Sequence, residues 1–174
     1  MTTMFASRIS RRSLLKAAAF TITAGALTTA TAPFAKAEPG TIVGTVIDFA
    51  AGVPDAQAVK DGGFLGAVRY VSQRRPGAEW MLGKPVTRQE TDAMANLGLK
   101  TASVYQFGKE ETADWKQGAE GARVHAPQAI ELHRAAGGPT GRPIYVAIDD
   151  NPTREQYDNQ IRPYLQTFRT LLSD

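Results

Sequence analysis

The sequence predicts an α/β protein in which strands alternate with helices. Four runs rich in Val, Ile, Tyr or Phe, each bounded by Gly, Pro or polar residues, are typical of strands: residues 45–50, 66–72, 101–108 and 143–150. Helix-type stretches follow each of them, so the order is β-α repeated four times. This alternation indicates parallel strand pairing.

The first two predicted helices are short. Residues 55–61 form the first, and residues 87–96 form the second. Thr87 and Glu90, three residues apart in "TRQE", form a capping-box pattern at the start of the second helix. Gly98 follows as a C-terminal stop.

The last two predicted helices are longer. The third spans about 113–136, and Pro127 predicts a kink or break near 124–126, because proline lacks a backbone donor and clashes with the preceding turn. The fourth spans 153–172, with large side chains at helical spacing: Tyr157, Ile161, Tyr164, Leu165, Phe168 and Leu172.

The fourth strand shows which face of the sheet each side chain takes. Successive side chains point to opposite faces. The β-branched set, Ile144, Val146 and Ile148, suits packing under helices. The mixed set, Tyr145, Ala147 and Asp149, suits the interior and rim of a barrel.

Four β/α units are half of an eight-unit barrel, which typically needs about 250 residues. A half-barrel leaves two strand edges open, which is a liability. We expect either a truncated chain, a small open sheet, or pairing with a second copy. Truncation is favoured, because the sequence has no loop into a fifth strand after Ser173.

The N-terminus has the pattern of a twin-arginine signal peptide. Arg11 and Arg12 precede a moderately apolar stretch, and "AKA" at 35–37 fits a signal-peptidase site. A membrane anchor is the alternative, but the stretch is rich in Thr, Ala and Gly, whereas a spanning helix needs about 20 strongly apolar residues. We expect residues 1–37 to be the signal and residues 38–174 to be one domain.

The charge balance changes once the signal is set aside. Five of the 20 basic residues and none of the 17 acidic residues lie in 1–37, so residues 38–174 carry 15 basic and 17 acidic residues, a net of −2. This gives no reason to expect nucleic acid as a partner. The chain has no cysteine, so its fold depends on its core and not on disulfides.

Five segments make the chain similar to a known family. The segments "TVIDFAAGVP", "GAVRYVSQRRPG", "GKPVTRQE", "GLKTASVYQFG" and "RPIYVAIDDNPT" resemble actinobacterial exported proteins with a glycoside-hydrolase-like domain of poorly defined function. The resemblance extends from about Thr41 to Asp174. It implies a TIM-like (β/α) barrel related to the lysozyme-type muramidases, of which this chain would hold about the first four β/α units.

The resemblance also points to catalytic residues. Asp48, at the end of the first strand, resembles an acid of the muramidase-like barrels, and Asp149 resembles the first acid of their Asp-x-Glu or Asp-x-Asp motif. Position 151, where the second acid is expected, is Asn151. Glycoside hydrolysis needs a proton donor and a second group, either a carboxylate or the substrate's own N-acetyl group.

Each of these polar residues also has a structural interpretation. Asp149 could be a buried acid paired with Arg69 on the second strand. Asp150 suits a cap or loop role, and its alternation points it away from Asp149. Asn151 before Pro152 fits a helix N-cap, although Thr153 with Gln156 is a competing capping box.

Further candidates for substrate binding lie near the ends of the second and third strands. They are Arg69, Tyr70, Tyr105 and Gln106, and we include Asp150, Asn151 and Trp80 with them. Trp80, like Trp115, suits either stacking on a sugar or covering the core. The sequence has no Cys/His metal spacing, phosphate loop or nucleophile elbow, so we expect no metal and no cofactor.

Two functions remain open at this point. The first is a cell-wall glycan hydrolase that uses Asp149 and Asp48. The second is a non-catalytic carbohydrate-binding or wall-associated protein with a degenerate active site. Both imply a partner in cell-wall polysaccharide or peptidoglycan glycan, the twin-arginine translocase during export, and a location outside the cell or on its wall.

Overall fold

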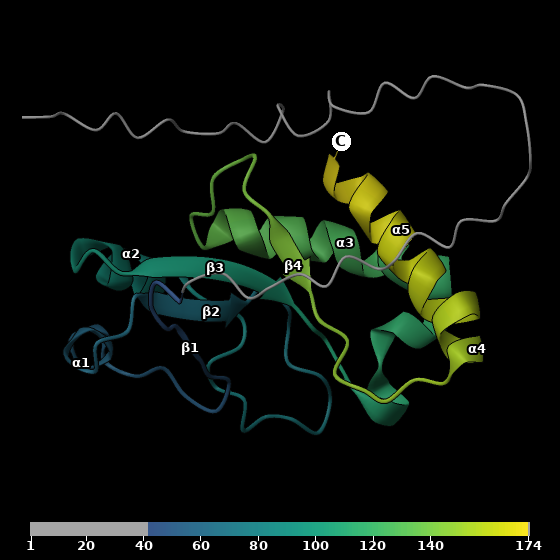
Figure 1. Ribbon diagram of the computed structural model, residues 1–174, viewed down its shortest axis with the longest axis horizontal. Coiled ribbons are helices and arrows are strands. Elements are labelled where there is room, and N and C mark those ends of the chain that lie inside the picture. Colours follow the sequence, from purple (N-terminus) through teal and green to yellow (C-terminus); the bar gives the residue numbers. More distant parts are fainter. Residues whose placement is uncertain (1–41, 174) are drawn as a thin grey trace, which may run out of the picture. The chain divides into compact units, whose positions relative to one another are not determined.

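The computed structural model describes residues 42–173, so the expected signal peptide at 1–37 lies outside the described residues. The strands are β1 (Ile47–Asp48), β2 (Gly66–Tyr70), β3 (Lys100–Tyr105) and β4 (Ile144–Val146). They form one parallel sheet in the order β1-β2-β3-β4 (Figure 1). The predicted parallel α/β arrangement is therefore confirmed.

A helical segment follows each strand, as the sequence predicts, although the third predicted helix begins at Gly118 and not at 113. They are α1 (Ala56–Asp61), α2 (Arg88–Asn96), α3 (Gly118–Ala135), α4 (Arg154–Gln156) and α5 (Arg162–Ser173). Two 3-10 turns, Glu110–Thr112 and Asp114–Gln117, precede α3, and a π-helical turn, Tyr157–Ile161, joins α4 to α5. None of the described helices is long and apolar enough to cross a membrane.

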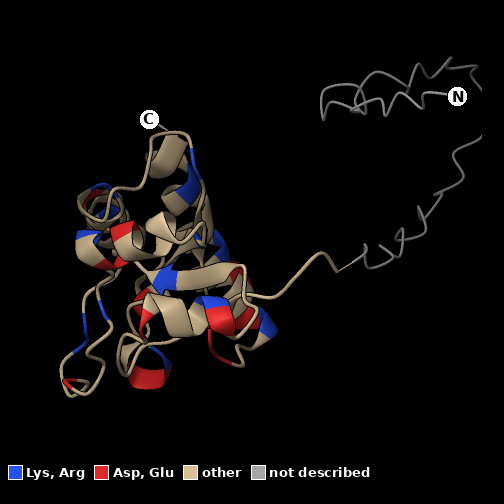
Figure 2. Ribbon diagram, turned by 90° about the vertical axis from the view of Figure 1, so that its left-hand side faces the viewer, with Lys and Arg blue, Asp and Glu red and all other residues tan. Residues whose placement is uncertain are grey.

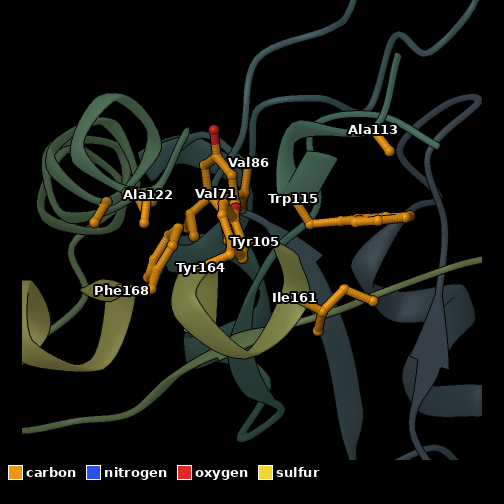
Figure 3. Packing of buried hydrophobic residues seen from close by; sticks show 12 residues of the cluster. Val71, Val86, Tyr105, Ala113, Trp115, Ala122, Ile161, Tyr164 and Phe168 are labelled. Carbon is orange, nitrogen blue, oxygen red and sulfur yellow. The ribbon is translucent and has the colours of Figure 1, made fainter. Parts of the chain in front are cut away.

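The helices pack against the sheet through two apolar clusters. The smaller cluster joins α1 and α2 to β1 through Val59, Met94 and Leu99. The larger cluster joins α3 and α5 to β3 and β4, and Figure 3 shows its labelled side chains, including Tyr105, Trp115, Tyr164 and Phe168. Burial of these side chains is the main source of the domain's stability.

The predicted alternation of the fourth strand is confirmed on the helix side. Ile144, Val146 and Ile148 pack against the larger cluster. Tyr145, on the opposite face, is 59% exposed, and Val46 beside β1 is 51% exposed. The face that would be the interior of a barrel is thus open to solvent at both outer strands.

The prediction near residues 124–126 was a kink or a break, and the break is wrong, because α3 continues through Pro127. Pro127 is exposed, whereas Ala122, Ala126 and Ala129 on the same helix are fully buried against the core. Packing of this small-residue face holds the helix together despite the missing donor, as tertiary contacts routinely override local propensity.

The predicted capping box forms completely at the start of α4 and only in part at the start of α2. Thr153 and Gln156 form a complete capping box, so Thr153 and not Asn151 begins the last helix. At α2, Thr87 Oγ1 accepts a hydrogen bond from the Glu90 amide, but the Glu90 carboxylate turns away to Arg69. The Gly98 stop has a positive φ of 79° just after α2.

Charge is distributed without a strongly basic face in the view of Figure 2. Lys and Arg segments lie next to Asp and Glu segments in that view. Four of the ion pairs in residues 42–173 join neighbouring turns within helical segments, as Arg88 with Asp92 does on α2. This agrees with the near-neutral balance calculated for residues 38–174.

Candidate functional site

Four polar side chains gather where the parallel strands end. Asp48 and Tyr70 are the last residues of β1 and β2, Gln106 directly follows β3, and Asp149 follows β4 by three residues. We call these four residues the mouth. Ligand sites of parallel α/β sheets lie at the carboxyl ends of the strands, so this is the expected position for a functional site.

Each acid of the mouth is hydrogen-bonded to a neighbour from the adjacent strand. The Tyr70 hydroxyl donates to Asp48 Oδ2 at 2.7 Å. The Gln106 amide nitrogen, Nε2, donates to Asp149 Oδ2 at 3.3 Å. The mouth therefore consists of two donor–acid pairs, one on β1 and β2 and the other on β3 and β4.

Tyr70 connects these pairs electrostatically. Burial, then the hydrogen bond and negative charge of Asp48, raise the pKa of Tyr70 well above its usual value, and the charge of Asp149 adds to this. Tyr70 is therefore a protonated donor at neutral pH and lies within electrostatic reach of both acids.

Lys84 lies beneath the mouth and was not among the residues predicted from the sequence. Its side chain comes from the connection between β2 and α2, and the residue is only 4% exposed. The ammonium nitrogen, Nζ, donates to the Gln106 backbone oxygen at 2.7 Å and lies 4.1 Å from the centre of the Tyr70 ring. Lys84 thus contacts one residue of each pair.

Ser72 is a second residue that the sequence did not reveal. Its hydroxyl donates to the same Gln106 oxygen at 2.7 Å. Ser72 and Lys84 lie 34 and 22 positions from Gln106 in the chain. No local pattern marks such long-range partners, so only the fold identifies them.

Arg69 does not line the mouth, which corrects its predicted role in contacting substrate. It is fully buried, forms an ion pair with Glu90, and donates to the backbone oxygens of Phe49 and Gly83. It also stacks on the Phe49 ring at 3.7 Å. The alternative pairing of Arg69 with Asp149 is also wrong, because the arginine points to the helix-packed face.

Tyr105 is also on the helix-packed face and not at the mouth. It is fully buried, and its hydroxyl is hydrogen-bonded to His125 Nδ1 and donates to Gln128 on α3. Burial, followed by the charge of Asp114, raises the pKa of Tyr105. The alternation of strand β3 explains the placement, since Gln106 takes the opposite face.

Asp150 and Asn151 lie beside the mouth, at a polar pocket that shares Asp149 with it. Asp150 accepts hydrogen bonds from Trp115 Nε1 at 2.7 Å and from the Glu110 amide at 2.8 Å, which fits its predicted loop role. Asn151 is exposed. The pocket has a volume of about 530 Å³, and its lining includes Asp149, Asp150, Asn151, Trp115, Lys109 and Lys116.

The two tryptophans have different environments. Trp115 is 3% exposed and belongs to the larger core cluster. Trp80 is 57% exposed in the connection between β2 and α2, and its indole joins none of the hydrogen bonds of the mouth among residues 42–173. Within the same range, no group of three or more His, Cys, Asp or Glu side chains is placed to hold a metal ion.

The family of the chain follows from its sequence match. Residues 57–174 match the family described as Rv2525c-like, glycoside hydrolase-like domain. The chain belongs to this family. It is also 48% identical over 166 residues to Rv2525c of Mycobacterium tuberculosis, a protein named as a candidate peptidoglycan hydrolase, and the match covers 94% of this chain and 69% of that protein.

Solved structures agree with this assignment. The crystal structure of the Mycobacterium tuberculosis Tat-secreted protein Rv2525c in complex with L-tartrate superposes with a TM-score of 0.74 at 52% identity, covering 75% of this chain and 64% of that one. This chain thus spans less than two thirds of the crystallised relative. A protein of B. stearothermophilus without a characterised function has a TM-score of 0.51 at 21% identity and is similar in fold alone.

Proposed function

We propose that this protein is an exported glycoside hydrolase that acts on cell-wall glycan at the mouth. The observation that carries the proposal is the placement of two acids, Asp48 and Asp149, at the same end of a parallel sheet, each held by a donor from the adjacent strand. The relationship to Rv2525c, a candidate peptidoglycan hydrolase, supports peptidoglycan as the substrate class.

The sheet is, on this proposal, part of a TIM-like (β/α) barrel. The parallel order β1-β2-β3-β4 and the helices packed on one face support it. The open opposite face would then line the barrel interior, and the mouth would lie at the end where such barrels bind their substrates.

The two carboxyl groups would supply the two roles of glycoside hydrolysis. One gives a proton to the oxygen of the leaving sugar, and the other stabilises the positive charge that develops at the sugar ring. Asn151 stands where the related motif has its second acid, so it cannot give a proton in that role. It can still donate to or accept from an N-acetyl group.

A substrate-assisted variant of this chemistry needs only one enzyme carboxyl group. Asp48 ends β1 and Asp149 follows β4, the two outer strands, so the curvature of the sheet sets the distance between their carboxyl groups. Two-carboxylate hydrolases hold their acids about 5–9.5 Å apart. In a substrate-assisted reaction, the N-acetyl group of the substrate takes the second role beside Asp149.

Asn151, at the position where a second acid is expected, is the observation that favours the second candidate function. A protein with Asn151 in place of that acid would bind glycan without cleaving it. The mouth and the neighbouring polar pocket would then recognise sugar hydroxyl and N-acetyl groups through Tyr70, Gln106 and Asp149.

An assay on purified insoluble peptidoglycan tests these two functions. We expect the wild-type chain to bind the glycan and to release reducing sugar, and Asp149→Asn to lose release by at least about 100-fold, the usual size of an acid–base contribution. Asp92→Asn on α2 is the matched control, because Asp92 is an exposed acid that pairs with Arg88 and is not one of the four mouth residues. Binding without release by the wild type would identify the non-catalytic function.

Export is part of the proposal. The twin-arginine pattern in residues 1–37 supports use of the twin-arginine translocase, and the related crystal structure is that of a Tat-secreted protein. The expected location is outside the cell or on its wall. Replacement of Arg11 and Arg12 by lysine should keep the protein in the cytoplasm, which cell fractionation would measure.

A further inference from the structure

Lys84 combines deep burial with an incomplete set of partners. The residue is 4% exposed, and no carboxylate of residues 42–173 lies within ion-pair distance of its ammonium. An ammonium has three donors. One bonds to the Gln106 oxygen and the group lies against the Tyr70 ring, so donor capacity remains beside the mouth.

This placement costs stability. Burial, the largest cause, lowers the pKa of Lys84 from 10.5 to about 8, and the positive charge of Arg75 adds to the effect. Taking a charged group out of water is unfavourable unless an opposite charge and hydrogen bonds compensate it. A buried lysine without a carboxylate partner is therefore poorly explained by a structural role.

The contacts of Lys84 suggest what it does instead. Tyr70 holds Asp48, and Gln106 holds Asp149, so the two residues that Lys84 touches are those that orient the two acids. The contact on Gln106 is to its backbone oxygen, which fixes the chain next to the side chain that reaches Asp149. Lys84 is the contact between the two pairs.

We propose that Lys84 is a positioning residue of the mouth, whose ammonium group holds the Asp48–Tyr70 pair and the Gln106–Asp149 pair in one arrangement around the glycan. This inference rests on the proposed function and adds a residue to it. Lys84 acts through Tyr70 and Gln106 and does not itself need to touch the sugar.

Ser72 makes this role separable from folding. Its hydroxyl donates to the same Gln106 oxygen as Lys84, so that oxygen keeps a partner when the ammonium is removed. Lys84→Met should therefore fold normally and lose only the contact between the pairs. A methionine also fills much of the same volume.

Protonation of Lys84 is part of this role, because only the charged ammonium is attracted to the Tyr70 ring. The charged and titratable groups around its ammonium are Asp48 from β1, Arg69 and Tyr70 from β2, Arg75 from the connection after β2, and Asp114 from the 3-10 turn before α3. The two acids favour the charged form, and the arginines and burial oppose it. Glycan binding should weaken as pH rises through about 8.

The test compares the full-length wild type, Lys84→Met and Lys84→Arg. Binding to insoluble peptidoglycan and release of reducing sugar are measured from pH 6.5 to 9.5, with the thermal midpoint of each variant. We expect a wild-type decline centred near pH 8. Lys84→Met should be at least tenfold weaker at pH 7 and show no such decline, and Lys84→Arg should move the decline to higher pH. Lys60→Met, on an exposed position of α1, should behave as the wild type.

The outcomes separate this inference from the function on which it rests. A wild type that neither binds nor cleaves peptidoglycan overturns both. A wild type that does either, with Lys84→Met unchanged in strength and pH profile, overturns the role of Lys84 alone. If Lys84→Met fails to fold, the wild-type profile decides: a flat response between pH 7 and 9 overturns the proposal.

Discussion

Arg69 and Lys84 are two buried cations in neighbouring parts of the molecule, and their surroundings differ. Arg69 is fully buried, with the Glu90 carboxylate and two backbone oxygens around its guanidinium. Lys84 is almost as deeply buried, but it has one backbone oxygen and one aromatic ring. The charge of Arg69 is balanced by a carboxylate, whereas the charge of Lys84 has no carboxylate within ion-pair distance among residues 42–173.

The difference shows which buried charge serves the fold and which serves the site. The planar guanidinium of Arg69 bonds in several directions at once, and through Glu90 it ties β2 to α2. Gly83 allows this approach, because a Cβ there would lie 3.1 Å from Arg69 Nη2 and 3.0 Å from the Gly52 oxygen. Lys84 is the next residue in the chain, and its compact ammonium group lies at the mouth, against the Gln106 oxygen and the Tyr70 ring.

The largest effect that this comparison predicts is on the Arg69–Glu90 pair. Glu90→Gln leaves the buried guanidinium without a compensating charge, so we expect a loss of about 3–5 kcal/mol in the free energy of unfolding. Urea denaturation monitored by circular dichroism measures it. The control is Asp92→Asn on the same helix, whose exposed pair with Arg88 should contribute less than about 1 kcal/mol. Equal losses in the two variants would contradict a structural role for the buried pair.

A second, smaller effect concerns the shared Gln106 oxygen. Ser72→Ala should cost about 1 kcal/mol in the wild type, because Lys84 still donates to that oxygen. In the Lys84→Met background the same change leaves the oxygen without either donor, and the cost should rise to about 1–3 kcal/mol. A double-mutant cycle by urea denaturation gives the coupling. Additive changes would show that the two donors do not share the oxygen.

The smallest effect is the pH dependence of stability. The pKa of Lys84 is about 8 in the folded chain and 10.5 when unfolded, so the unfolded state binds more protons between these values and stability rises with pH. We expect a contribution of about 1 kcal/mol between pH 7.5 and 9 that Lys84→Met lacks. Denaturation midpoints at these two pH values measure it. The window stops below pH 10, where tyrosines such as Tyr70, whose folded pKa is raised, act in the opposite direction.

Local patterns predicted the elements, and they failed where distant residues competed. The Thr153–Gln156 box formed as its spacing indicated, because both partners lie in the same turn. At α2, only half of the Thr87–Glu90 box formed, because Arg69, 21 positions away, takes the Glu90 carboxylate. Likewise, burial of the alanine face of α3 outweighs the local penalty at Pro127.

For the site, too, the features that depend on local geometry were predictable from the sequence. Alternation along a strand placed Asp149 correctly opposite the helix-facing Ile144, Val146 and Ile148, because it depends only on backbone geometry. The prediction of which residues near the ends of the second and third strands face the mouth was less exact. Arg69 and Tyr105 each lie one residue before a mouth residue, Tyr70 and Gln106, and a shift of one residue reverses the face.

The sequence by itself determined the parallel α/β order and the helix-facing side of the fourth strand. These follow from the alternation of strands with helices and from the alternation of side chains along a strand. The tertiary structure alone decided that Arg69 pairs with Glu90 and that Ser72 and Lys84 meet at the Gln106 oxygen. Such contacts join residues more than 20 positions apart, and only the packing of the strands and their connections brings them together.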